Sequence, residues 1–141
     1  MIIFGKNKKL KPMKKLLLLL LCVPLIGIGQ TEYKKTYYEN GKTETEGNYI
    51  DGRKEGLWKW YYESGELEST GIYKNGQSHG IFHGWYKNGQ LRCEGYFKYD
   101  KLDNYFKYIQ ENGRLSFFRK YKDGKIISET RWDKNGKEYS D

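Results

Sequence analysis

Polar and apolar residues alternate along most of the chain beyond residue 30, in short runs that end at glycine or asparagine corners. The segment 58–73 shows the pattern clearly. Large side chains recur on every second residue from Trp58, the run breaks at Ser64-Gly65, and a second alternating run follows. Period-two alternation rich in aromatic residues is typical of β-strands with two distinct faces. No stretch of this part combines helical spacing with helix-favouring residues, so the pattern predicts an all-β chain.

One glycine in each unit marks a sequence repeat. These glycines are Gly41, Gly65, Gly89, Gly113 and Gly136, and the steps between them are 24, 24, 24 and 23. A fixed period of this size indicates a repeat protein, in which each unit buries its apolar face against its neighbours. We therefore expect residues 30–141 to form a single-domain antiparallel β-hairpin repeat array, a meander of about ten short strands.

Each repeat glycine follows an asparagine, except in Ser64-Gly65. Asn-Gly between extended runs favours a two-residue type I′ turn, because both central residues of that turn need positive φ. Counting outward from these turns predicts the cross-strand pairs Tyr62–Leu67, Trp60–Ser69, Trp58–Gly71, Tyr86–Leu91, Gly84–Cys93, Phe82–Gly95, Gln110–Leu115, Tyr108–Phe117 and Phe106–Arg119. A ring beside a strand glycine covers the backbone and fixes the register. A second set of turns links the hairpins within 51–56, 75–80, 99–104 and 123–125.

Residues 1–29 have the features of an export leader. Six lysines precede an apolar run from Leu16 to Ile28, and Gly27 and Gly29 supply small side chains before a cleavage point at Gln30. The apolar run is shorter than the roughly 20 residues that span a bilayer as a helix. We therefore predict a signal peptide over residues 1–29, export to the periplasm, cell envelope or extracellular space, and no membrane span after cleavage.

Other uses of this leader stay open. An uncleaved leader would anchor the chain to a membrane, and acylation of Cys22 would make it a lipoprotein. Leu21, which precedes Cys22, is larger than the small residue that lipoprotein leaders usually carry at that position. Translation starts at Met1 or at Met13, since the sequence from Met13 is itself a compact leader.

Charge and cysteine content change this picture little. The whole chain carries a net charge of +8, but six lysines and no acidic residues lie in 1–29, so residues 30–141 carry only +2. The basic character therefore belongs largely to the leader and does not indicate a nucleic-acid partner. Without Cys22, Cys93 has no second cysteine to form an internal disulfide, and we expect it to be a buried small residue.

Candidate catalytic and metal-binding residues are sparse. His79 and His83 are close in sequence, but they lie on a turn and a strand, where their spacing does not align two metal ligands. The carboxylates recur as solvent-face residues beside the turns, and the glycines are spaced by hairpins, so no phosphate-binding loop occurs. We predict no metal site, no cofactor and no enzymatic activity.

A candidate binding stripe lies on the other face of the hairpins. It consists of Tyr37, Tyr61 and Trp85, which occupy the same position in successive repeats, and it continues to Ile109. The predicted cross-strand partners of these residues are polar or charged, at Glu44, Glu68, Arg92 and Ser116. An aromatic stripe edged with charge suits a peptide, a glycan or a second subunit. The alternative is that these rings pack within the sheet and stabilise it.

The repeated frame resembles a known family. The sequence from Gly56 to Leu67, followed by Gly71-Ile72-Tyr73-Lys74-Asn75-Gly76, is similar to the variant form of the MORN repeat, which is widespread in bacterial proteins. The resemblance covers roughly residues 37–137 and implies consecutive β-hairpins in an elongated, curled sheet. The fourth unit departs from the frame at Asn104, Gln110 and Arg119.

This resemblance implies a function only in broad terms. MORN arrays generally serve as interaction or membrane-proximal scaffolds, and relatives of the variant type are often described as antitoxin-like. The favoured hypothesis is an exported, non-enzymatic binding or scaffold module whose partner is another protein or an envelope component. An antitoxin or immunity protein that neutralises a cognate toxin is the alternative. An envelope enzyme would need polar residues converging in a deep pocket, which a repeat sheet seldom provides.

Overall fold

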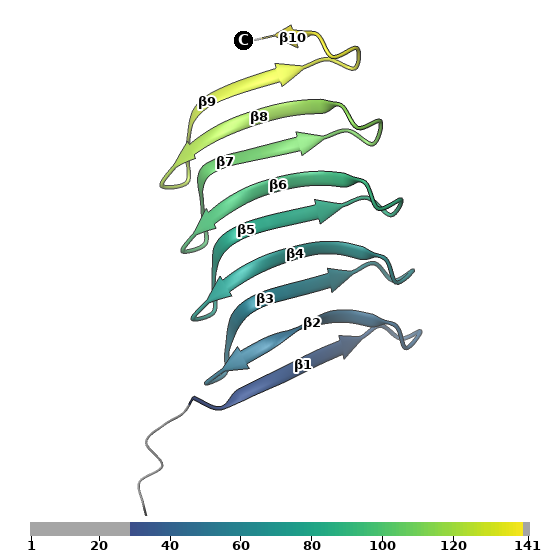
Figure 1. The fold of residues 1–141 in the computed structure, drawn as a ribbon, viewed down its shortest axis with the longest axis vertical. Helices are drawn as coiled ribbons and strands as arrows, with labels where there is room; N and C mark the ends of the chain where they lie inside the picture. Colours follow the sequence, from purple (N-terminus) through teal and green to yellow (C-terminus); the bar gives the residue numbers. More distant parts are fainter. Residues whose placement is uncertain (1–28, 140–141) are drawn as a thin grey trace, which may run out of the picture.

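A computed structural model describes residues 29–139 and contains one antiparallel sheet of ten strands in sequence order (Figure 1). The strands are β1 (Thr31–Tyr37), β2 (Thr43–Ile50), β3 (Arg53–Tyr61), β4 (Leu67–Lys74), β5 (Gln77–Trp85), β6 (Leu91–Lys98), β7 (Lys101–Ile109), β8 (Leu115–Lys122), β9 (Lys125–Trp132) and β10 (Glu138–Tyr139). The all-β repeat array is therefore confirmed. The predicted leader lies outside the described residues, apart from Gly29.

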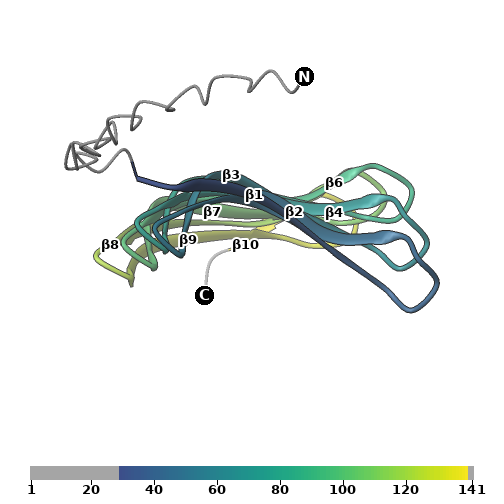
Figure 2. The same cartoon turned by 90° about the horizontal axis from the view of Figure 1, so that it is seen from below.

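The sheet is a single curved and twisted layer, as the view along the stack shows (Figure 2). Every strand pairs only with its neighbours in sequence, and among the described residues no second layer covers either face. Within residues 29–139, the buried apolar side chains are Trp58, Cys93 and Tyr121, and most other large side chains are half-buried. The same residues include no helix long and apolar enough to cross a membrane. Stability therefore rests on contacts between adjacent strands within each face.

The turns at the repeat glycines differ from the predicted type. The amide of Tyr62 donates to the Glu66 carbonyl at 2.9 Å, and the amide of Gly65 donates to the Tyr62 carbonyl at 2.8 Å. Gly65 has a φ of 103°, whereas Ser64 is not among the residues with positive φ. This is a type I turn followed by a glycine bulge, which makes a longer loop, and the prediction of a type I′ turn was wrong here.

The longer loop changes the strand register close to the turn and nowhere else. Leu67 pairs with Tyr61, not with Tyr62, and the next two units show the same displacement, with Trp85–Leu91 and Ile109–Leu115 as pairs. A bulge after the first pair restores the predicted count. The remaining predicted pairs are confirmed: Trp60–Ser69, Trp58–Gly71, Gly84–Cys93, Phe82–Gly95, Tyr108–Phe117 and Phe106–Arg119.

Type I′ turns occur at the opposite ends of the strands, where each hairpin is linked to the next. Ile50 pairs with Arg53, so Asp51 and Gly52 form the loop between them, and both have positive φ, 50° at Asp51 and 73° at Gly52. The other three links share this geometry, at Asn75-Gly76, Tyr99-Asp100 and Asp123-Gly124. Asn, Asp and Gly tolerate these left-handed conformations, which explains most of the residues used there.

The repeats are joined by a series of tyrosine hydrogen bonds. The hydroxyl of Tyr62 donates to the Trp85 carbonyl of the next hairpin at 2.7 Å. Equivalent bonds in the flanking repeats run from Tyr38 to the Tyr61 carbonyl at 2.5 Å and from Tyr86 to the Ile109 carbonyl at 2.9 Å. Gln110 takes the tyrosine position in the following unit, so the series ends there.

The substitution Tyr62→Phe tests this series. We expect it to lower the free energy of unfolding by about 1 kcal/mol, because it removes one inter-repeat hydrogen bond and keeps the ring. Tyr96→Phe is the control, since the Tyr96 hydroxyl makes no hydrogen bond within residues 29–139. Denaturant titration should therefore show a loss only for Tyr62→Phe. Equal effects of the two changes would mean that the tyrosine bond adds no stability.

A bulge occurs wherever one hairpin pairs with the next. These bulges explain two irregularities of the sequence: the departure of the fourth repeat at Asn104 and the shorter last step of the glycine series. Gly56, Leu57 and Trp58 of β3 lie opposite Gly47 of β2, and Gly56 has a φ of 70°. Asn104 takes the position of Gly56 in β7 with a φ of 73°, so asparagine preserves the bulge. Between β8 and β9 the bulge contains Ile127 alone, because Ser128 pairs with Lys120 and Ile126 with Tyr121. The shorter last repeat therefore follows from a smaller bulge.

Candidate binding face

The two faces of the sheet differ in chemistry. One face, the tryptophan face, has an aromatic row along most of its length; strand alternation and pairing place on it Trp58, Trp60, Tyr73, Phe82, Phe97, Phe106, Tyr108 and Phe117. The other face, the glutamate face, is organised around two carboxylates, Glu46 and Glu94, which lie two repeats apart. The two faces therefore offer different chemistry to a partner.

On the tryptophan face, the chain covers its own most buried ring. Trp58 is 3% exposed, its indole N–H donates to the Asn48 carbonyl at 3.1 Å, and the edge of Tyr49 meets it at 5.0 Å. The Lys54 ammonium lies 4.4 Å from the Trp58 ring centre and within 5.1 Å of the rings of Trp60 and Tyr73. Burial lowers the pKa of Lys54. These rings therefore pack against one another, and a cation of the chain itself already occupies the position that a bound cation would take.

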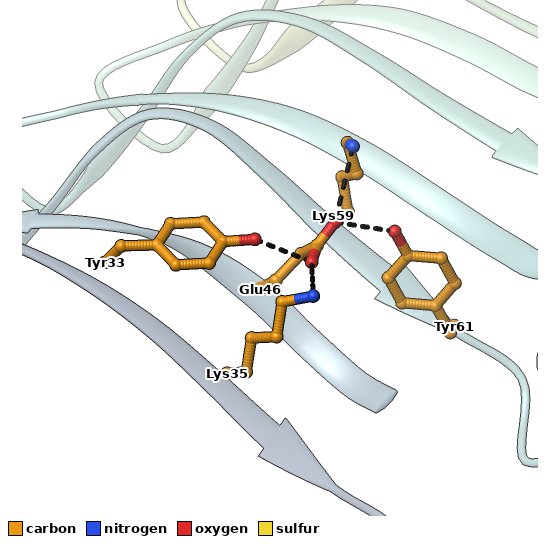
Figure 3. A network of polar contacts seen from close by, with 5 residues as sticks. All are labelled: Tyr33, Lys35, Glu46, Lys59 and Tyr61. Atoms are coloured by element: carbon orange, nitrogen blue, oxygen red, sulfur yellow. Dashed lines mark hydrogen bonds and ion pairs between the residues drawn. The ribbon is translucent and has the colours of Figure 1, made fainter. Parts of the chain in front are cut away.

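The glutamate face contains a dense polar network around Glu46 (Figure 3). Glu46 is 9% exposed. The hydroxyls of Tyr33 and Tyr61 each donate to its carboxylate at 2.7 Å. The ammonium groups of Lys35 and Lys59 lie 2.8 and 3.3 Å away. These four groups, led by Lys35, lower the pKa of Glu46 to about 2. Because the donors come from β1 and β3, one buried carboxylate on β2 connects the first two hairpins.

A second network of the same kind surrounds Glu94. Tyr105 donates its hydroxyl to this carboxylate, Lys107 lies 3.2 Å away and His83 3.5 Å away. Tyr105 contributes most to lowering the pKa of Glu94. His83 thus contacts a carboxylate, while His79 packs against Tyr99 at 4.6 Å between ring centres. Residues 29–139 contain no group of three or more side chains placed to hold a metal ion.

These networks predict an acid-sensitive fold. The pKa of Glu46 falls from an ordinary 4.5 to about 2 on folding, so the unfolded chain binds a proton first as the pH drops. The stability that Glu46 contributes is therefore complete above about pH 5 and is lost towards pH 2. Glu94 and Glu129, whose pKa values are also lowered, act in the same direction.

The substitution Glu46→Gln isolates the first network. We expect it to cost about 2 kcal/mol at neutral pH, because four donors lose a charged acceptor. The variant should also lose less stability than the parent chain between pH 5 and pH 2. Denaturant titrations at several pH values provide the measurement. Parallel curves for the two proteins would contradict the role given to Glu46.

The predicted stripe lies on the glutamate face, but its members are not equivalent. Tyr37 is 60% exposed, whereas Tyr61 is half-buried and donates its hydroxyl to Glu46. Trp85 is half-buried and, with Leu67, lines an open depression of about 390 Å³. The cross-strand partners predicted for the stripe were wrong. The register near the turn places Thr43 opposite Tyr37 and leucines opposite the other members, at Leu67, Leu91 and Leu115. The use of this stripe in binding stays a prediction.

Exposed aliphatic residues, which the sequence interpretation missed, lie on the same face as the stripe. Leu57 is 47% exposed, Ile81 45% and Ile72 36%. Leu57 pairs with Ile72, and Ile81 occupies the position of Leu57 one repeat later, so all three lie on the glutamate face of β3–β5. The recurrence of an aliphatic residue at this repeat position was visible in the sequence. The recurrence is limited to the two central repeats, because Tyr33 and Tyr105 occupy the same position in the outer repeats.

Comparison with known proteins identifies the repeat. The sequence model of the MORN repeat variant family matches three consecutive segments, residues 33–51, 54–75 and 78–99. Curated proteins gave no match. Among solved structures, the chain is similar to one described as accessory secretory protein 1, 2 and 3 of Streptococcus pneumoniae, at 18% identity and a TM-score of 0.40. That likeness covers 65% of this chain and 17% of the other.

Each matched segment covers one hairpin with its turn glycine, at Gly41, Gly65 or Gly89, and the second and third also contain the bulge at Gly56 or Gly80. The match therefore follows the structural unit of the sheet. MORN repeats are in general non-catalytic modules used for binding or scaffolding. Residues 33–99 of this chain are repeats of the MORN variant family.

Proposed function

We propose that this chain is an exported binding or scaffold module that contacts a partner protein or envelope component through its glutamate face. The observation that carries the proposal is the row of exposed apolar residues on this face, formed by Leu57, Ile72 and Ile81. The tryptophan face offers less, because Lys54 already occupies its aromatic cluster. Apolar side chains beside charged networks are typical of the centre and rim of a protein interface.

The open shape of the sheet also supports this proposal. A single layer gives a partner access to side chains from several strands at once, and the described residues include no second layer to enclose a small substrate. The leader features of residues 1–29 support export. The N-terminus of protein recovered from the envelope fraction tests that part. A start at Gln30 is expected, and an intact start at Met1 or Met13 would contradict cleavage.

Site-specific photocrosslinking from the full chain tests the binding face. Crosslinking residues placed at Leu57 and at Ile81 should capture the same partner in the envelope fraction. Ile127 on β9, which is 63% exposed, is the matched control and should not capture that partner. Equal capture from all three positions, or none, would contradict the proposal. Capture of a toxic protein that the chain neutralises would assign the antitoxin function to this face.

A further inference from the structure

The two ends of the sheet differ in how their free edges are protected. β1, Thr31–Tyr37, has a long outer edge that pairs with no strand of the described chain. At the other end, β10 is short and pairs only with Arg131 and Trp132, and β9 is interrupted by the bulge at Ile127. Short strands and bulges are devices that hinder further strand pairing, whereas a long regular edge favours it. β1 is therefore the edge suited to accept another strand.

The exposed side chains of β1 decide which strand fits. Lys35 is held by Glu46 at 2.8 Å and is not available to an incoming strand. Glu32 and Lys34 are exposed, and both lie on the tryptophan face at successive positions of that face. Lys34 lies 5.6 Å from the Tyr49 ring centre, a loose contact that leaves its charge free for an ion pair. The edge thus presents one acid and one base with strand spacing.

This charge pattern is self-complementary in one register. When two identical strands pair antiparallel, the two-fold axis passes between one residue and the same residue of the second copy. This follows because the backbone groups that point outward from a strand recur on every second residue. Centring on Glu32, Lys34 or Lys35 places like charges directly opposite each other, which is unfavourable. Centring on Tyr33 instead places Glu32 opposite Lys34 of the second copy, twice, and sets the two Tyr33 rings side by side. Centring nearer either end of β1 leaves few pairs.

We propose that two copies of this chain pair antiparallel along their β1 edges, centred on Tyr33, and so form one continuous sheet. Paired residues point to the same side, so the two glutamate faces become one surface. The Glu46 networks of the two copies then lie on either side of the central tyrosines, because each Tyr33 donates to its own Glu46. The apolar row at Leu57 and Ile81 is present twice on this surface, which strengthens binding to a partner with repeated sites. That last consequence rests on the proposed function, whereas the dimer itself does not.

A charge exchange on the full chain tests the register. Sedimentation velocity at low salt should show a dimer, and Glu32→Lys or Lys34→Glu alone should raise its dissociation constant at least tenfold. The double variant, Glu32→Lys with Lys34→Glu, restores both ion pairs and should return to within about threefold of the parent chain. Lys125→Glu at the far end of the sheet is the control and should leave the dimer unchanged. Circular dichroism verifies that each variant folds.

A disulfide trap provides an independent readout. Tyr33→Cys places two thiols directly opposite each other across the axis, within disulfide distance, so mild oxidation should yield a covalent dimer. Thr31→Cys lies on the same face, but its two copies are offset by about 13 Å along the strands and should not crosslink. The parent chain is oxidised in parallel to account for its own cysteines, of which Cys93 is buried. A monomer at all concentrations, or filaments formed through β9, would overturn the proposal. So would single variants that dimerise as well as the parent, or strand pairing only with a different protein.

Discussion

Replacing Trp58 with alanine should cost about 3–5 kcal/mol of unfolding free energy, the largest effect expected from any single side chain of the sheet. Trp58 is 3% exposed and combines three kinds of contact: an indole hydrogen bond to Asn48, an edge contact with Tyr49 and the Lys54 ammonium over its ring. A domain of this size has a total stability of roughly 5–15 kcal/mol. The variant should therefore be marginally folded at room temperature.

Leu57→Ala is the matched control for Trp58→Ala. Leu57 is the adjacent residue on the same strand, but it points to the glutamate face and is 47% exposed. Its truncation should cost less than about 1 kcal/mol. Denaturant titration of the two variants gives the comparison. Similar losses would show that the tryptophan face is not the main source of stability.

Gly47→Ala should destabilise the protein by about 1–3 kcal/mol or more, although it adds only one methyl group. A Cβ at Gly47 would lie 2.4 Å from two ring atoms of Trp58 and 2.7 Å from a third. These distances are far shorter than van der Waals contact, and Trp58 cannot move without breaking its other contacts. The same conflict exists at Gly95, where a Cβ would lie 2.6 Å from Phe106.

Gly71→Ala is the control at the equivalent position of the intervening repeat. Its Cβ would lie 3.5 Å or more from Tyr73, Phe82 and Trp60, which is ordinary contact. The change should therefore stay within about 0.5 kcal/mol of the parent chain, since alanine also costs less chain entropy than glycine. A double variant with Trp58→Ala should show strong non-additivity at Gly47 and none at Gly71. Equal effects at the two glycines would contradict the packing described.

The contrast between these glycines shows what the sequence predicted and what it did not. Alternation and the regular glycine period were sufficient for ten antiparallel strands in sequence order, because both depend on local geometry. The pairing of Trp58 with Gly71 was also predicted correctly. The glycine that the ring covers most closely is nevertheless Gly47, on the preceding strand. That contact depends on the bulge at Gly56, which no local pattern specified.

The turn types were a second difference, with a clear physical cause. Asn-Gly suits both a type I′ turn and a type I turn with a glycine bulge, so the dipeptide alone does not select the loop length. The longer loop moved Leu67 from Tyr62 to Tyr61 and replaced the charged surroundings predicted for the stripe with leucines. The Glu46 network was not predicted either. Its side chains come from three strands, so predicting their contacts requires the register of all three strands.

The most direct test of the account is a map of backbone and side-chain proximities in solution by nuclear Overhauser effects. We expect backbone cross-strand contacts only between strands adjacent in sequence, from β1–β2 to β9–β10, with Tyr61 opposite Leu67 and Ile50 opposite Arg53. Contacts between two β1 strands would come from the second copy. Contacts between β1 and β10, or between Trp58 and Phe117, would show a closed or two-layered fold and contradict the single open sheet.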